Sequence, residues 1–238
     1  MKLSRNITAL LANIYTELVP SILRNAFMDK LLLDLFLPKV STAGIIEFHR
    51  SPERWSDSSF VKACYQKVGT PIARKTDLNK ECIEYIVRTI SGKAILDAGA
   101  GLGHLTSLLS LNESNQVTAL EFKVSTQLQK LESHNIKICQ GSIENSLPFK
   151  DSQFDVVICT HVLEHIVNLK AAINELRRIS KERLVIVVPL QTPSRYTPDL
   201  HMRYFMYPKN FLVETLPCNG QSHWKVLGGD LLYEEYFD

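Results

Sequence analysis

The sequence predicts an α/β protein, a doubly wound and mostly parallel sheet that follows an N-terminal helical extension. From residue 77 onward, short apolar runs alternate with segments whose apolar residues recur at helical spacing. These runs are continuous, which is typical of parallel strands covered by helices on both faces. A glycine-rich turn, GAGLG, joins the first run to the next helical segment. The pattern therefore predicts a ligand site where the parallel strands end.

The expected elements follow in order from residue 77. A helix over 79–90 has its apolar residues on one face, and Asn79 is placed to cap its first turn. We expect strands at 94–98, 116–121, 136–140, 154–160 and 182–190. Helices are expected at 104–111, 124–134, 168–180 and 209–216, with final strands from residue 223. Right-handed crossovers place the carboxyl ends of the parallel strands at one edge of the sheet.

The first 76 residues differ from the rest, so we expect two parts, an extension or lid at 1–76 and a ligand-binding domain at 77–238. Residues 7–36 predict two amphipathic helices separated near Pro20. A further helix is expected in the second half of 51–68, with Phe60, Val61, Cys64 and Val68 on one face. Such a part can serve as a lid, a dimer contact or a membrane-surface helix. Simple packing on the main domain is the preferred interpretation.

Composition excludes several classes of protein. The net charge is only +2, with 45% hydrophobic and 22% charged residues, so we expect a soluble globular protein and no nucleic-acid partner. Five dispersed cysteines without a CxxC pair suggest a reducing, cytoplasmic location. The most apolar run, LLLDLFL, is too short to span a bilayer. With no zinc motif in the sequence, we expect no metal.

The glycine turn ILDAGAGLGH leaves the identity of its ligand open. Gly99, Gly101 and Gly103 occupy the first positions of a dinucleotide motif, but His104 stands where a further glycine is expected. This departure makes an NAD-dependent enzyme the weakest interpretation. Glu121, at the end of the second predicted strand, is placed to accept hydrogen bonds from ribose hydroxyls of either kind of nucleotide.

A longer ordered run, CQGSIENSLPFKDSQFDVVICTHVLEHI, narrows the choice. Together with DAGAGLG upstream, it resembles class I S-adenosylmethionine-dependent methyltransferases of the small-molecule, methyltransferase type 11-like group. Members of this group read G-D-A-E, L-P-F, F-D-V-V and V-L-E-H in that order. The resemblance covers roughly residues 94–190. It implies a seven-stranded Rossmann-like methyltransferase fold and S-adenosylmethionine as cofactor.

The resemblance also implies which residues bind the cofactor. The group that shapes the pocket for the methionine portion is Asp97, Gly99, Ala100, Gly101 and Gly103. The group that faces the ribose and adenine is Glu121, Phe122, Ser142 and Ile143. Thr160 and His161 close the pocket near the sulfonium. Ser142 stands where relatives usually carry Asp, which predicts a weaker hydrogen bond to the adenine amino group.

Methyl transfer to oxygen or nitrogen releases a proton, so a histidine beside the cofactor is a candidate base. His165 is the preferred candidate and His161 the second, although either can simply brace its loop. Downstream, His201 and Arg203 match the H-x-R-[FY]-F segment of many relatives and are further catalytic candidates. Two roles stay open for Arg203: it can pair with an anionic group on the acceptor, or pin its own loop to Asp199 or Glu214.

The expected function is methyl transfer to an O or N atom of a small or medium-sized acceptor, such as a sugar, lipid precursor or natural-product intermediate. A non-catalytic S-adenosylmethionine-binding partner of another methyltransferase is one alternative. An RNA or protein methyltransferase is another, but the chain reads CTHV where amine-methylating enzymes carry N-P-P-[YF]. We expect a monomer or homodimer.

Overall fold

The computed structural model describes residues 20, 30, 31, 33, 34, 37–68, 75–192, 199–218 and 220–237. The chain divides into two compact units. Unit 1 contains residues 1–74 and 192–202, and unit 2 contains residues 75–191 and 203–238. The helices predicted within residues 7–36 lie largely outside the described residues. None of the described helices is long and apolar enough to cross a membrane.

Unit 1 is built on two helices, α3 (Lys39–Arg50) and α4 (Ser58–Val68), with the short turn η2 (Pro52–Arg54) between them. The helix predicted in the second half of 51–68 is confirmed, because α4 buries Phe60, Cys64 and Val68 at intervals of four residues. Trp55 stacks on Phe48 of α3, with ring centroids 5.3 Å apart. Leu200 belongs to the same apolar cluster. The sequence did not suggest that residues this far downstream belong with the N-terminal part.

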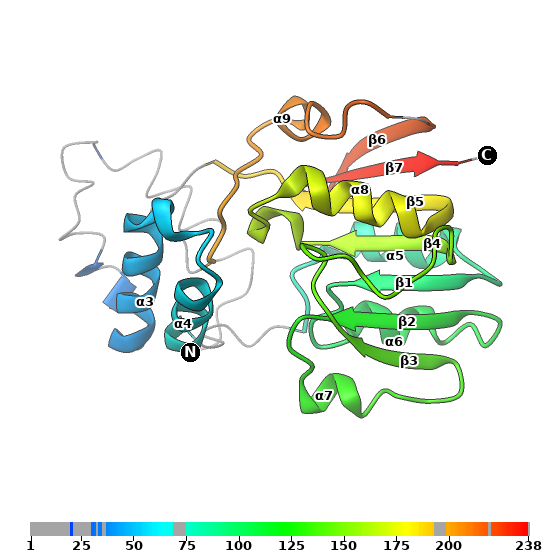
Figure 1. The fold of residues 1–238 in the computed structure, drawn as a ribbon, viewed down its shortest axis with the longest axis horizontal. Helices are drawn as coiled ribbons and strands as arrows, with labels where there is room; N and C mark the ends of the chain where they lie inside the picture. The colour runs from blue at the N-terminus through cyan, green and yellow to red at the C-terminus, as the bar shows by residue number, and fades with distance from the viewer. Residues whose placement is uncertain are drawn as a thin grey trace. The chain divides into compact units, whose positions relative to one another are not determined.

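Unit 2 is a seven-stranded sheet with helices on both faces (Figure 1). Its first half comprises α5 (Lys80–Thr89), β1 (Ala94–Ala98), α6 (His104–Leu109), β2 (Gln116–Glu121), α7 (Thr126–Gln129) and β3 (Ile136–Gln140). Its second half comprises β4 (Phe154–Thr160), η3 (Leu163–His165), α8 (Leu169–Ile179), β5 (Ser180–Pro189), α9 (Pro208–Leu212), β6 (Gln221–Leu227) and β7 (Asp230–Tyr236). The predicted α/β architecture with seven strands is confirmed.

The strand order is β3-β2-β1-β4-β5-β7-β6. The pairs among β1 to β5 are parallel, whereas β7 is antiparallel to both β5 and β6. Strand order therefore reverses between β1 and β4. In open α/β sheets, such a reversal opens a crevice at the carboxyl ends of the strands, where ligands bind.

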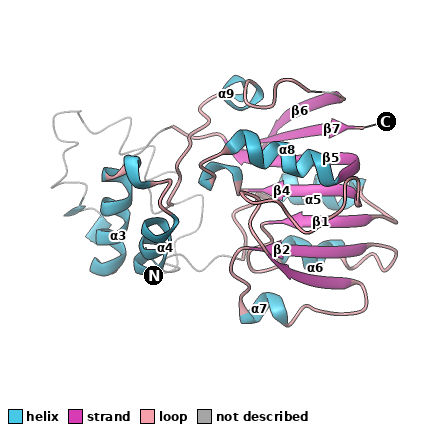
Figure 2. Ribbon diagram, in the orientation of Figure 1, coloured by secondary structure: helices cyan, strands magenta, loops and turns pink. Residues whose placement is uncertain are grey.

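Helices cover both faces of the sheet (Figure 2), and one apolar layer lies between the sheet and the helices on each face. One layer packs α8 against the face that carries Leu96 and Val157. The other packs α5 and α6 against the opposite face, which carries Ile95 and Val117. Adjacent residues of β1 thus point to opposite faces, and both faces are apolar, which explains the continuous apolar runs in the sequence.

The expected helices at 79–90 and 168–180 are confirmed as α5 and α8. The Asn79 side chain accepts a hydrogen bond from the main-chain N–H of Cys82, as predicted for a cap. The helix expected at 124–134 is only one turn long, α7 (Thr126–Gln129). Ser125 caps this turn and Leu128 is buried, but residues 129 and 130 and 132–134 are exposed. Extending the helix beyond residue 129 would bury no further row of apolar side chains, so the sequence does not favour a longer helix there.

Candidate cofactor and active site

The glycine turn after β1 is tightly packed at its first glycine and open at its second. Gly99 has φ +83°, and a Cβ added there would lie 2.1 Å from Cγ2 of Val162, so glycine is required on both grounds. Gly101 has φ +57°, and no atom of the described residues lies within 4 Å of a Cβ built on it. Gly103 caps α6, and the main-chain N–H groups of Gly99 and Ala100 donate to the Leu120 carbonyl at 2.8 and 3.1 Å. The turn is therefore rigid, with free space above Gly101.

Two carboxylates lie at neighbouring strand ends beside this turn. Asp97 of β1 is 1% exposed and accepts a hydrogen bond from the Thr106 hydroxyl at 2.6 Å. Burial is the main reason why the pKa of Asp97 rises to about 6, and the nearby charge of Glu121 adds to it. Glu121, at the end of β2, accepts a hydrogen bond from the main-chain N–H of Gly101 at 2.8 Å. Glu121 is thus bonded to the glycine turn itself, and Asp97 to the helix α6 that follows it.

Asp97 gives a test of whether the site fits a positively charged ligand. No lysine, arginine or histidine among the described residues forms an ion pair with this buried carboxylate, although such groups are normally paired. S-adenosylmethionine carries an ammonium and a sulfonium group. A buried carboxylate without a cationic partner among the described residues, next to the space that these residues leave at Gly101, fits such a molecule.

The residues predicted to face the adenine lie at the ends of β2 and β3. Phe122 is 64% exposed, so its ring is available to stack against a planar group. Ser142 is half-buried, and its hydroxyl oxygen accepts a hydrogen bond from the main-chain N–H of Glu144 at 3.3 Å. Ile143 is different, because its side chain is buried in the apolar layer beneath α8. Any part it plays in binding an adenine must come from its main chain.

His161, directly after β4, is held between two buried carboxylates. Its Nε2 lies 3.1 Å from Oδ2 of Asp230 in β7, and its Nδ1 lies 3.4 Å from Oε1 of Glu164 in η3. Burial of the ring opposes its charge, but the hydrogen bonds and charges of the two carboxylates outweigh burial and raise the pKa of His161 to about 9. The ring is therefore protonated at neutral pH. Thr160, the last residue of β4, is half-buried.

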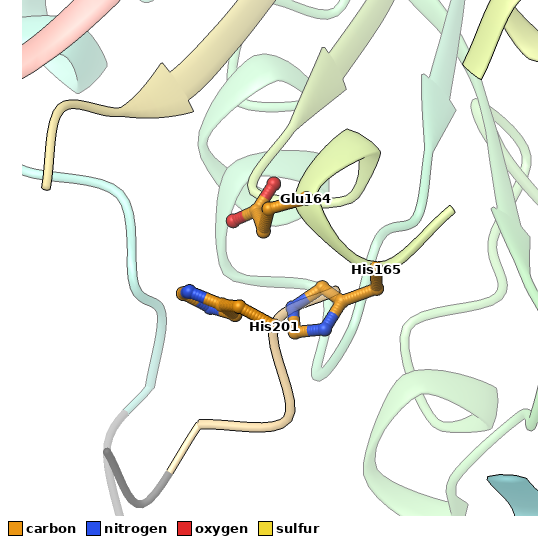
Figure 3. Close-up of side chains that lie close together, drawn as sticks. All are labelled: Glu164, His165 and His201. Atoms are coloured by element: carbon orange, nitrogen blue, oxygen red, sulfur yellow. The ribbon is translucent and has the colours of Figure 1, made fainter. Parts of the chain in front are cut away.

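Glu164 and His165 are consecutive residues of the short turn η3 (Figure 3). The Glu164 side chain is fully buried, whereas His165 is half-buried. Both carry atoms that are able to ligate a metal ion. His201, drawn in the same figure, belongs to unit 1, so its predicted catalytic role stays a prediction. The prediction that no metal is bound also stays a prediction.

Arg203 holds the chain on both sides of His165. Its guanidinium donates to the carbonyls of Ile166 at 3.0 Å and Val167 at 2.6 Å, and its main-chain N–H donates to the Glu164 carbonyl at 3.1 Å. Of the two roles left open by the sequence, this geometry favours pinning the loop. The acceptors are main-chain carbonyls, however, and not the carboxylates of Asp199 or Glu214.

Sequence reasoning missed three residues that organise this site. Asp230 and Glu164 hold the His161 ring, and Glu144 accepts a hydrogen bond from the main-chain N–H of Val167 at 3.0 Å. Glu164 lies within the run VLEH and Glu144 within the run GSIE, but the groups with which their side chains interact depend on the fold. Asp230 carries no local signal, because it reaches His161 across 69 residues of chain.

Comparison with known proteins agrees with this geometry. Residues 96–188 match a family model described as a methyltransferase domain. The chain is 33% identical over 151 residues to a protein of Rickettsia bellii named ubiquinone biosynthesis O-methyltransferase, covering 61% of this chain and 60% of that protein. An uncharacterised protein of Methanocaldococcus jannaschii is 38% identical over 140 residues, 58% of each chain. The chain thus spans about 60% of the length of these curated relatives.

Solved structures show the same fold. The YcgJ protein of Bacillus subtilis has a TM-score of 0.52 at 19% identity, covering 62% of this chain and 71% of that chain. An S-adenosylmethionine-dependent methyltransferase of Aquifex aeolicus has a TM-score of 0.52 at 18% identity, covering 65% and 87%. The chain carries a class I S-adenosylmethionine-dependent methyltransferase domain. Residues 96–188 of this domain are similar to the type 11-like methyltransferases, and its cofactor is S-adenosylmethionine.

Proposed function

We propose that this protein transfers a methyl group from S-adenosylmethionine to an oxygen or nitrogen atom of a small or medium-sized acceptor, with His165 as the base. The first acceptor class to test is a hydroxylated quinone precursor. Relatives named ubiquinone biosynthesis O-methyltransferase and, at 30% identity over 125 residues, demethylmenaquinone methyltransferase of Staphylococcus saprophyticus support this choice.

The observation that carries the proposal is the common position of the cofactor turn and the candidate base. Val162, after β4, packs against Gly99, and three residues further along the chain η3 presents His165. The glycine turn thus follows the carboxyl end of β1, and the candidate base follows that of β4. Strand order reverses between these two strands. Cofactor loop and base meet at one edge of the sheet.

Most of the predicted cofactor residues have a part in the proposed complex. The Asp97 carboxylate and the turn Gly99, Ala100, Gly101 and Gly103 receive the methionine portion. Glu121 receives the ribose hydroxyls, Phe122 and Ser142 the adenine, and Thr160 closes the pocket. When bound, S-adenosylmethionine supplies an electrophilic methyl group on a sulfonium, which becomes a neutral thioether as the methyl moves to the acceptor.

The protein's part in the reaction is alignment and removal of one proton. His165 takes the proton from the acceptor hydroxyl as the new carbon–oxygen bond forms, and passes it to solvent. His161 is unsuited to that role, because a ring with a pKa of about 9 already holds a proton at neutral pH. Arg203 fixes the main chain on either side of His165, which keeps the base in place.

The test is methyl transfer from labelled S-adenosylmethionine to hydroxylated quinone precursors, with RNA and protein pools as separate arms. We expect label in the small-molecule arm, and His165→Gln to lower kcat by about 100-fold at an unchanged affinity for S-adenosylhomocysteine. His134→Gln is the control, since His134 is exposed and lies just before the amino end of β3, at the edge of the sheet opposite to the proposed site. Equal activity of H165Q and H134Q would exclude His165 as the base. Cofactor binding without label in any arm would favour the regulatory alternative.

A further inference from the structure

His161 has an unusual main-chain conformation for a residue with a side chain. Its φ is +54°, in the left-handed region that glycine, asparagine and aspartate adopt most readily. A non-glycine residue persists there when its surroundings hold it. His161 lies between the end of β4 and η3, so this conformation sets the direction in which the chain leaves the sheet.

Contacts from three different elements hold His161. Its main-chain N–H donates to the carbonyl of Val187 in β5 at 2.9 Å. Its ring, 10% exposed, bonds to Asp230 of β7 on one side and faces Glu164 of η3 on the other, and both carboxylates are completely buried. With a charge between two buried carboxylates, the ring has little freedom to turn.

The contacts continue beyond Asp230 to the start of α5. Nδ2 of Asn79 donates to Oδ2 of Asp230 at 2.7 Å and to the carbonyl of Leu227 at 2.8 Å. The same side chain caps α5 through its Oδ1. A Cβ at Gly228 would lie 2.7 Å from Asn79, so the turn between β6 and β7 packs closely on this group. Asn79, Asp230, His161 and Glu164 thus form one polar chain with its two carboxylates fully buried, which we call the Asn79–Glu164 chain.

The residue after His161 connects this chain to the cofactor turn. Val162 is the side chain that a Cβ at Gly99 would strike at 2.1 Å. Any rotation of the main chain at His161 moves Val162 and changes its packing against Gly99. The position of the first glycine of the turn therefore depends on how firmly His161 is held.

We propose that Asp230 is a positioning residue for the cofactor: through His161 it holds Val162 against Gly99 and thereby sets the affinity for S-adenosylmethionine and its product. Asp230 belongs to neither the glycine turn nor the residues that the family resemblance assigns to the cofactor. The raised pKa of His161 is consistent with this role, because it reflects the strength of the same contacts. The proposal rests on the proposed cofactor but not on the acceptor or on His165.

The test is the dissociation constant for S-adenosylhomocysteine, measured by calorimetry at pH 7.5 on the full chain. Asp230→Asn keeps the shape of the side chain and an oxygen that can accept from Asn79, but removes the charge facing His161. We expect the dissociation constant to rise about tenfold, within the usual range for coupled sites.

Glu235→Gln provides the matched control. Glu235 is also a completely buried carboxylate of β7, bonded to Arg177 and to the Tyr233 hydroxyl. It points to the opposite face of the sheet from Asp230, because five residues separate them. E235Q should lower thermal stability yet leave the dissociation constant within about twofold. Equal loss of affinity in D230N and E235Q would assign both effects to general destabilisation and overturn the proposal.

A double-mutant cycle tests the route through His161. Glycine at position 161 adopts φ +54° without support from other residues, so in His161→Gly the Asn79–Glu164 chain is no longer needed to hold the main chain. D230N should then cause no further loss of affinity in the H161G background. The same loss in both backgrounds would overturn the proposal.

If D230N does not fold, Asn79→Ser replaces it, because serine still caps α5 but lacks the Nδ2 group that donates to Asp230, and its hydroxyl ends one bond short of that position. Its dissociation constant should rise about threefold, and a value equal to that of the natural protein would overturn the proposal. If the natural protein itself does not bind S-adenosylhomocysteine, the proposed function fails as well. If it binds and the variants match it, only this inference fails.

Discussion

Asp97→Asn should make the unliganded protein more stable while weakening cofactor binding. Burial raises the pKa of Asp97 from 3.8 to about 6, so its ionised form is disfavoured in the folded state. The shift of about two units corresponds to about 3 kcal/mol. An asparagine can still accept the hydrogen bond of Thr106 and carries no charge to bury. The variant should therefore gain up to about 3 kcal/mol in free energy of unfolding at pH 7.5.

The pH dependence distinguishes this explanation from a simple packing effect. Because the folded-state pKa of this acid is raised, its destabilising effect is absent below pH 3.8, grows as pH rises and is complete above about pH 6. Urea unfolding of D97N and natural protein at pH 7.5 and pH 4 should show a gain at pH 7.5 and little at pH 4. A D97N variant less stable than natural protein at pH 7.5, or an equal gain at both pH values, would refute the reasoning.

Three further predictions concern the same site. Gly101→Ala should fold, at a cost of about 1 kcal/mol in unfolding free energy because of its positive φ, but it should bind S-adenosylhomocysteine weakly. Gly99→Ala should instead lose about 3 kcal/mol of unfolding free energy, measured with urea, because its Cβ would strike Val162. Arg203→Met should lower the unfolding free energy by about 2 kcal/mol, and a stability unchanged from natural protein would exclude its role in pinning η3. The pKa of His161 is raised from 6.5 to about 9, so the stability that its charge contributes is complete below pH 6.5 and is lost as pH rises through 9. This loss should amount to about 3 kcal/mol in unfolding free energy. His161→Asn should not show it in unfolding curves measured between pH 6 and 10.

The fold could be predicted from the sequence where pattern and packing coincide. Residues 94–96 of β1, 156–159 of β4 and 184–189 of β5 are apolar without a break because both faces of a central parallel strand are buried, and the glycine turn follows from the tight exit of β1. The cap of α5 was equally visible as Asn79, whereas the cap of α8, Asn168, was not predicted. The helix at 124–134 was overestimated, because its apolar residues do not form a continuous stripe.

The partners within the site could not be predicted, since they come from residues far apart in the sequence. Asp230 reaches His161 only because β7 inserts antiparallel between β5 and β6, and no local pattern near residue 230 reports that order. The catalytic role predicted for Arg203 from its motif stays a prediction, and its carbonyl acceptors depend on the path of the chain after η3. The sequence motifs therefore indicated which side chains to consider, whereas their hydrogen-bond partners and protonation states depend on the fold.

Calorimetric titration of the natural protein with S-adenosylhomocysteine, with NAD in a parallel titration, tests the central claim most directly. We expect one equivalent of S-adenosylhomocysteine to bind and NAD to give no heat, with loss of the S-adenosylhomocysteine signal in G101A, where the new Cβ fills space above the turn. Binding of NAD, or S-adenosylhomocysteine binding that is equally tight in G101A, would contradict a methyl-donor site at this turn.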